Sequence, residues 1–127
     1  MNYDDINDKL CELNTEDFIW IIYIGIIILS WYSNSLERKF FLFNDYLSKE
    51  KYRKIMVLIF SILIVVYCYF LKDSIDGLKK TKPTDSDKKK TLAFYSFIAS
   101  LLITISGFIF LYIALNDTNI DVEIAFN

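Results

Sequence analysis

The stretch Ile55–Leu71 reads IMVLIFSILIVVYCYFL, with Lys54 directly before it and Lys72 directly after it. It has 17 residues and no charge, and two more uncharged windows, residues 18–36 and 91–116, are 19 and 26 residues long. A bilayer core about 30 Å thick is crossed by roughly 17–25 apolar helical residues. The sequence therefore predicts an all-α membrane protein with three transmembrane helices in an antiparallel hairpin bundle, the helices extending beyond the bilayer.

The composition supports this class and excludes several kinds of chemistry. Of the 127 residues 54% are hydrophobic, more than the roughly 45–50% usual in soluble domains. The absence of histidine excludes His-based acid/base catalysis, His-activated nucleophiles and His-ligated metals. We expect no enzyme activity, no catalytic residue, no cofactor and no metal site.

The two cysteines are too few for a four-thiolate site. Three spans place Cys11 and Cys68 on the same side of the membrane. We expect two unpaired thiols, while a disulfide is the alternative that this topology permits.

Charge and periodicity divide the chain into three parts. In the last part Ile120, Val122, Ile124 and Phe126 alternate with polar or small residues, a repeat typical of an extended strand. The predicted parts are an acidic N-terminal tail (1–14), a three-span domain (15–116, with spans about 18–33, 55–71 and 92–115) and a C-terminal tail (117–127).

Capping residues mark the expected helix ends. Asn14 is a candidate cap for the first span, and Ser48 for the second after a turn at Asn44 and Asp45. Gly77 is a candidate stop for the second helix, and the segment 84–87 matches a capping box with Thr84 at the cap.

Aromatic side chains lie near the ends of the first two spans. Amphipathic rings favour the headgroup layer. The candidate interfacial anchors are Trp20, Trp31, Tyr32, Tyr67 and Tyr69.

The third span carries a stripe of small residues at helical spacing. Small side chains let transmembrane helices approach closely. We expect this face to pack against the first two spans, with a homo-oligomer seam and a polar pore lining as alternatives. The helix-packing candidates are Ala93, Ser96, Ser100, Thr104, Gly107 and Ala114.

Tyr23 is expected at the depth of Ser96 and Ser100, because the first and third spans cross in the same direction. A phenol within the hydrocarbon layer needs a partner, so one interpretation is a hydrogen bond from Tyr23 to one of these serines. The alternative is that the short first span lets its hydroxyl reach water.

The loop 72–91 holds seven Lys and four Asp. Basic residues near a membrane surface attract anionic lipid, and the alternative is a solvated loop. Nucleic acid is not an expected partner, because no aromatic residues interleave these lysines. The orientation stays open, since the tail plus this loop carry 8 Lys/Arg and the opposite side carries 6.

The stretch Leu13–Trp20, the basic aromatic first loop and the capped third span resemble uncharacterised small three-span membrane proteins of AT-rich bacteria. The abundance of Ile, Lys, Phe, Tyr and Asn, which have AT-rich codons, agrees with such a source. The resemblance implies no active residue and no substrate.

The functional expectation is a multi-pass protein of a bacterial cytoplasmic membrane. We expect it to act through protein or lipid contacts as an accessory, regulatory or protective subunit, with a membrane-protein partner or a second copy of itself. The alternative is an oligomeric, holin-like pore former.

Overall fold

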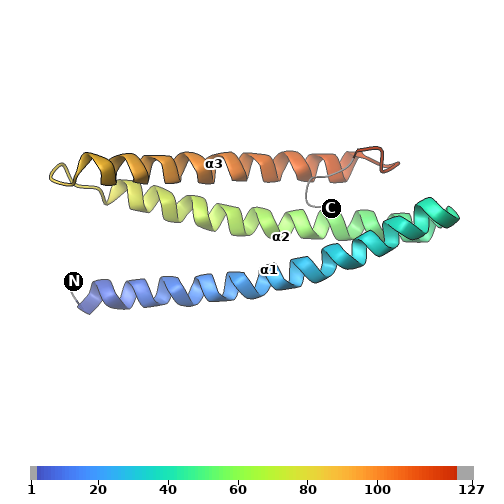
Figure 1. The fold of residues 1–127 in the computed structure, drawn as a ribbon, viewed down its shortest axis with the longest axis horizontal. Coiled ribbons are helices and arrows are strands. Elements are labelled where there is room, and N and C mark those ends of the chain that lie inside the picture. The colour runs from blue at the N-terminus through green and yellow to red at the C-terminus, as the bar shows by residue number, and fades with distance from the viewer. Residues whose placement is uncertain (1–2, 123–127) are drawn as a thin grey trace.

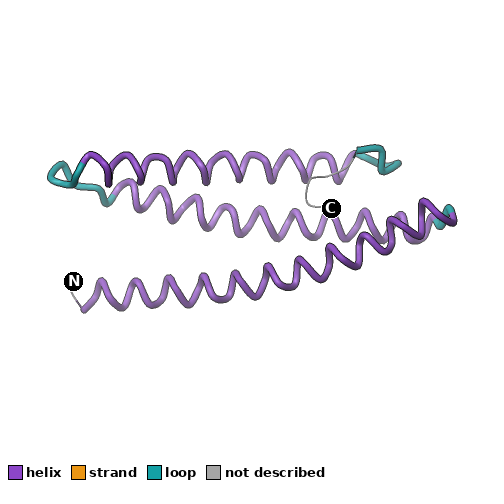
Figure 2. Tube along the Cα trace, in the orientation of Figure 1, coloured by secondary structure: helices purple, strands orange, loops and turns teal. Residues whose placement is uncertain are grey.

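The computed structural model describes residues 3–122 and consists of three long helices. They are α1 (Tyr3–Phe43), α2 (Tyr46–Lys79) and α3 (Asp87–Asn116), and the described part contains no strand (Figure 2). Each helix is long and apolar enough to cross a membrane. The prediction of an all-α, three-helix membrane protein is confirmed.

The middle helix α2 packs against both of the others. Within residues 3–122, no Cα atom of α1 lies within 8 Å of one in α3, so the helices form an open layer rather than a closed triangle. Short connections make each helix antiparallel to its predecessor. The ribbons of α1 and α2 lie close together near the turn that joins them and separate toward the N-terminus (Figure 1).

The contact between α1 and α2 follows a seven-residue repeat. Ile19, Ile26 and Ser33 are buried at intervals of seven, and Leu36 is buried one turn after Ser33. Half-buried Ile22 and Leu29 occupy the positions three residues after Ile19 and Ile26, and both pack against the core. This is the spacing of a left-handed coiled-coil seam.

The contact between α2 and α3 is closer, because a small residue lies at its centre. A Cβ atom added at Gly107 would lie 3.0 Å from Cδ2 of Tyr67. The Thr104 hydroxyl donates to the Ser100 carbonyl at 2.7 Å and lies 3.4 Å from the Tyr67 carbonyl of α2. Phe60, 1% exposed, stacks on Phe110 with ring centroids 5.5 Å apart.

The N-terminal segment differs from the expectation of a short tail ahead of a separate helix. α1 begins at Tyr3 and runs without a break through residue 14, so Asn14 lies inside the helix and caps nothing. Asp4 and Asp5 in the first turn favour this earlier start, because negative charge stabilises a helix N-terminus.

The turn between α1 and α2 lies at Asn44 and Asp45, as predicted, but the cap is Asp45 rather than Ser48. Asn44 has a φ of 51° and its N–H donates to the Phe40 carbonyl at 2.8 Å, which ends α1. The Asp45 carboxylate accepts from Leu47 N and Ser48 N. The Ser48 hydroxyl donates to Asp45 at 2.8 Å, so Ser48 supports the cap from inside the helix.

The expected ends of the second loop are also displaced. Gly77 lies within α2, which continues to Lys79 with Lys80 at the cap. The cap of α3 is Ser86, which accepts from Lys89 N at 3.2 Å, rather than Thr84. Asp85 explains the shift, because its carboxylate accepts from Lys82 N at 2.7 Å and holds the residues before Ser86 in a turn.

The described part of the C-terminal tail is a turn and not a strand. Ile120 has a φ of 56°, and Asp117 accepts from Asp121 N and Val122 N at 2.9 and 2.8 Å. The alternating residues Ile124 and Phe126 lie outside the described residues.

The close approach at Gly107 yields a prediction about stability. Gly107→Ala should be less stable than Gly25→Ala by about 1–3 kcal/mol, because both variants gain the helix preference of Ala while only Gly107→Ala overpacks a filled contact. Gly25 is the matched control, since a Cβ atom there meets nothing within 4 Å. Gly25→Ala should be neutral or stabilising, because Ala favours a helix over Gly by about 1 kcal/mol. Unfolding titrations in mixed micelles measure both, and equal stability of the two variants would contradict the assignment.

Candidate functional site

Three carboxylates meet where α1 and α2 begin to separate. Glu12 and Glu16 of α1 and Asp73 of α2 each offer an oxygen, and these oxygens lie within 4.8 Å of one another. All three residues are half-buried. They lie outside the predicted spans 18–33 and 55–71, at one end of the bundle.

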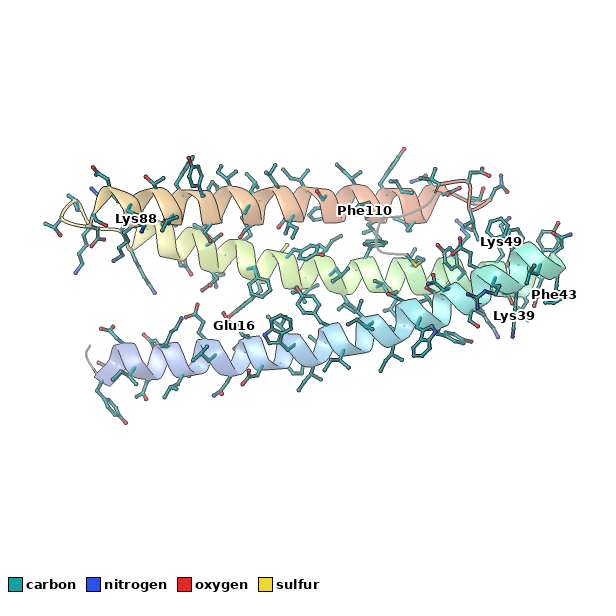
Figure 3. The ribbon with its side chains drawn as sticks, viewed as in Figure 1. Glu16, Lys39, Phe43, Lys49, Lys88 and Phe110 are labelled. Carbon is teal, nitrogen blue, oxygen red and sulfur yellow. The ribbon has the colours of Figure 1, made fainter. Side chains whose placement is uncertain are left out.

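The position of Glu12 follows from the packing of α1. Glu12 lies seven residues before Ile19, so it continues the buried face that includes Ile26. Glu16 lies one turn later, on the side of α1 that faces α2 (Figure 3). Along the face of α1 that contacts α2, apolar side chains within the span are therefore followed by carboxyl groups outside it.

The electrostatics of the cluster indicate a shared proton. A hydrogen bond with Glu12 is the main reason that the pKa of Asp73 rises to about 6, and burial and the negative charges of Glu12 and Glu16 raise it further. The same hydrogen bond lowers the pKa of Glu12. Below about pH 6 the Asp73 carboxyl therefore donates to the Glu12 carboxylate and joins α1 to α2.

Other charged groups surround this pair. The Lys9 ammonium lies 3.7 Å from Glu12 Oε2, and the charge of Lys80, the C-cap residue of α2, also lowers the pKa of Glu12. Carboxylate oxygens are the ligands of Mg²⁺ and Ca²⁺. The two ammonium groups offset part of the negative charge of the three carboxylates.

A cavity of about 270 Å³ extends from Asp73 toward the span. Its lining joins Asp73 to hydroxyl groups from all three helices, namely Tyr23, Tyr67, Ser74, Ser96 and Ser100. The predicted proximity of Tyr23 to Ser96 and Ser100 thus corresponds to one shared cavity. Among the described residues no hydrogen bond joins Tyr23 to either serine.

The residues of the small-residue stripe of α3 differ in how far they are buried. Thr104, Gly107 and Ala114 are the buried residues of α3. Ala93 and Ser100 are half-buried and Ser96 is exposed. The buried part of the stripe faces α2, where Gly107 lies against Tyr67, and no Cα atom of α1 lies within 8 Å of α3 among the described residues.

The aromatic candidates divide into two groups. Trp20, Trp31 and Tyr32 are exposed, and Tyr69 is half-buried. Tyr67 does not lie as expected for an interfacial anchor, because it is 8% exposed and packs against Gly107.

The lysine-rich loop and the cysteines are at the surface. Lys89 pairs with Asp85 at 3.4 Å, and Lys90 Nζ donates to the Pro83 carbonyl at 3.0 Å. Cys11 and Cys68 are both exposed free thiols.

The carboxylate cluster was missed at the sequence level. Glu12 was assigned to the acidic N-terminal tail (1–14) and Asp73 to the lysine-rich loop 72–91. The seven-residue interval from Glu12 to Ile19 and on to Ile26 is the signal that places Glu12 on the buried seam.

The shared proton predicts a pH-dependent distance between α1 and α2. The raised pKa of Asp73 stabilises the contact at low pH, and this contribution is lost as the pH rises through about 6. The lowered pKa of Glu12 stabilises the contact above the ordinary Glu value of 4.5. Spin labels on Cys11 and Cys68 should therefore report a shorter, narrower distance distribution at pH 5 than at pH 8.

Asp73→Asn tests the cause, because the amide donates to Glu12 at every pH and should remove the pH response. Asp76→Asn is the control, since Asp76 is an exposed acid one turn further along α2. The same pH response in Asp73→Asn as in the unaltered protein would exclude the shared proton.

Comparisons with protein-family models, curated proteins and solved structures find no match to this chain. The arrangement of its own residues is therefore the basis for the function proposed below.

Proposed function

We propose that the protein is a non-enzymatic accessory subunit, regulatory or protective, that acts in the bilayer through contacts with a partner protein or with lipid. The observation that supports this most directly is the open arrangement of the helices. α1 packs on one side of α2 only, and much of its apolar surface within the span is exposed, including Ile24, Ile27 and Ile28 at 59–65%.

A lateral groove between α1 and α2 adds to this surface. It has a volume of about 400 Å³, and its lining includes Trp20, Ile27 and Ser30 of α1 and Met56 and Leu63 of α2. A groove lined mainly by apolar groups, with an indole and a hydroxyl in its lining, is suited to contacts within a membrane.

The proposed location is the cytoplasmic membrane of a bacterium, and the abundance of residues with AT-rich codons supports such a source. Anionic lipid at the lysine-rich loop 72–91 is part of the same proposal. Most of its lysines, including Lys79, Lys82 and Lys88, are exposed and could lie against a negatively charged surface.

An oligomeric pore is less well supported. A pore lined by the third span would need its hydroxyl stripe to face a lumen. Thr104, Gly107 and Ala114 instead face α2, and the Thr104 hydroxyl donates to a backbone carbonyl of its own helix.

Site-specific photocrosslinking in membranes of the source cell tests the proposal. A photoreactive residue in place of Ile27 should give a discrete adduct with another protein, because Ile27 is 65% exposed on the groove. The same residue in place of Ile59, which is 1% exposed, is the buried control.

Dye release from vesicles that contain the purified protein separates the two functions. We expect no release over vesicles without protein. Release that rises steeply with protein density, together with adducts at Ile27 that contain only this chain, would favour the pore and contradict the accessory subunit.

A further inference from the structure

The opposite end of the bundle contains a cavity lined by charged residues where α2 begins and α3 ends. Its volume is about 450 Å³, and it is lined by Glu50, Arg53, Lys54 and Val57 of α2 and by Ala114 and Leu115 of α3. The four α2 residues follow at intervals of three, one and three, so they share one face of that helix.

The cavity lies at the boundary of the membrane. The uncharged stretch of α2 begins at Ile55, directly after Lys54, and that of α3 ends at Asn116, directly after Leu115. Its charged groups therefore lie at headgroup level, and Val57 and Leu115 lie on its hydrocarbon side. A ligand with a charged head and an apolar tail matches this order.

The basic groups of the cavity are only partly used by the protein. Arg53 Nη2 donates to the Leu115 carbonyl at 3.3 Å, while Arg53 Nε is buried and has no hydrogen-bond partner among the described residues. A guanidinium offers five N–H donors in a planar fork that matches a phosphate. The Asp117 carboxylate also attracts Arg53, so the donors left for a further acceptor are the remaining N–H groups at the tip of the guanidinium.

The acidic residue in the cavity restricts the kind of headgroup. Glu50 lines the same space as Arg53 and Lys54, yet within residues 3–122 no ion pair joins it to either. A purely anionic headgroup would be repelled by Glu50. A zwitterionic headgroup would place its phosphate on the two basic side chains and its cation on Glu50.

We propose that this cavity binds a phospholipid whose headgroup carries a primary amine, as in phosphatidylethanolamine. The phosphate lies against Arg53 and Lys54, the ammonium donates to Glu50, and the upper acyl chain follows Val57 and Leu115. The primary amine is preferred to the quaternary amine of phosphatidylcholine, because only the former donates hydrogen bonds to a carboxylate.

Native mass spectrometry of the detergent-purified full chain tests this with three lipids of identical acyl chains. Phosphatidylethanolamine should be retained about threefold more than phosphatidylcholine or phosphatidylglycerol. Arg53→Gln should lower its retention about tenfold, the equivalent of losing one charge-assisted contact. Lys51→Gln is the matched control, because Lys51 is an exposed base on the same helix that does not line the cavity.

Glu50→Gln provides a test that does not depend on the stability of the Arg53 variant, since Glu50 is exposed. This variant should bind phosphatidylethanolamine and phosphatidylcholine equally and should bind more phosphatidylglycerol. Unchanged selectivity in Glu50→Gln, or equal losses in Arg53→Gln and Lys51→Gln, would overturn the proposal.

Competition identifies the source of the phosphate. Inorganic phosphate and glycerophosphoethanolamine, which lack acyl chains, should not displace the lipid at equal concentration. Displacement by either of them would show that a soluble phosphate compound, and not a membrane lipid, is the ligand.

Discussion

The whole arrangement depends on the need of a backbone in hydrocarbon to satisfy its own hydrogen bonds. Three uncharged windows of 17 to 26 residues must therefore be helical throughout. The connection between α1 and α2 consists of Asn44 and Asp45, so α2 begins beside the end of α1. In the second connection the Asp85 carboxylate accepts from Lys82 N and holds a tight turn. Consecutive helices then pack as antiparallel neighbours, and within residues 3–122 α2 contacts both of the other helices.

The two contacts of α2 are built from side chains of different size, and this difference decides where space remains. On the α3 side Gly107 lets the backbones approach until the Tyr67 ring fills the gap. On the α1 side the buried seam consists of Ile19, Ile26, Ser33 and Leu36. The ribbons of α1 and α2 separate toward the N-terminus (Figure 1). This separation leaves the groove of about 400 Å³ between α1 and α2. An accessory role for this open side is consistent with that asymmetry.

The fold could be predicted from the sequence because hydropathy and length act over whole windows. The ends of the helices were harder to predict, because each end depends on one or two capping hydrogen bonds that any of several neighbouring residues could form. Asp45 and Ser48 are both good capping residues, and the choice between them follows from the left-handed φ of Asn44. The carboxylate cluster needed a contact between Glu12 and Asp73, 61 positions apart in the chain. No local pattern includes such a contact, although the seven-residue repeat of α1 already assigns Glu12 to the buried face.

The two charged ends of the bundle belong to different contacts, so they should respond independently. Glu12 and Asp73 join α1 to α2, and ionisation of Asp73 above about pH 6 weakens that contact alone. Arg53 lies at the junction of α2 with α3, which the close packing at Gly107 and the stacked rings of Phe60 and Phe110 stabilise. Among the described residues no Cα atom of α1 lies within 8 Å of one in α3. A change in pH should therefore alter the separation of α1 from α2 and the width of their groove, while the cavity around Arg53 keeps its shape.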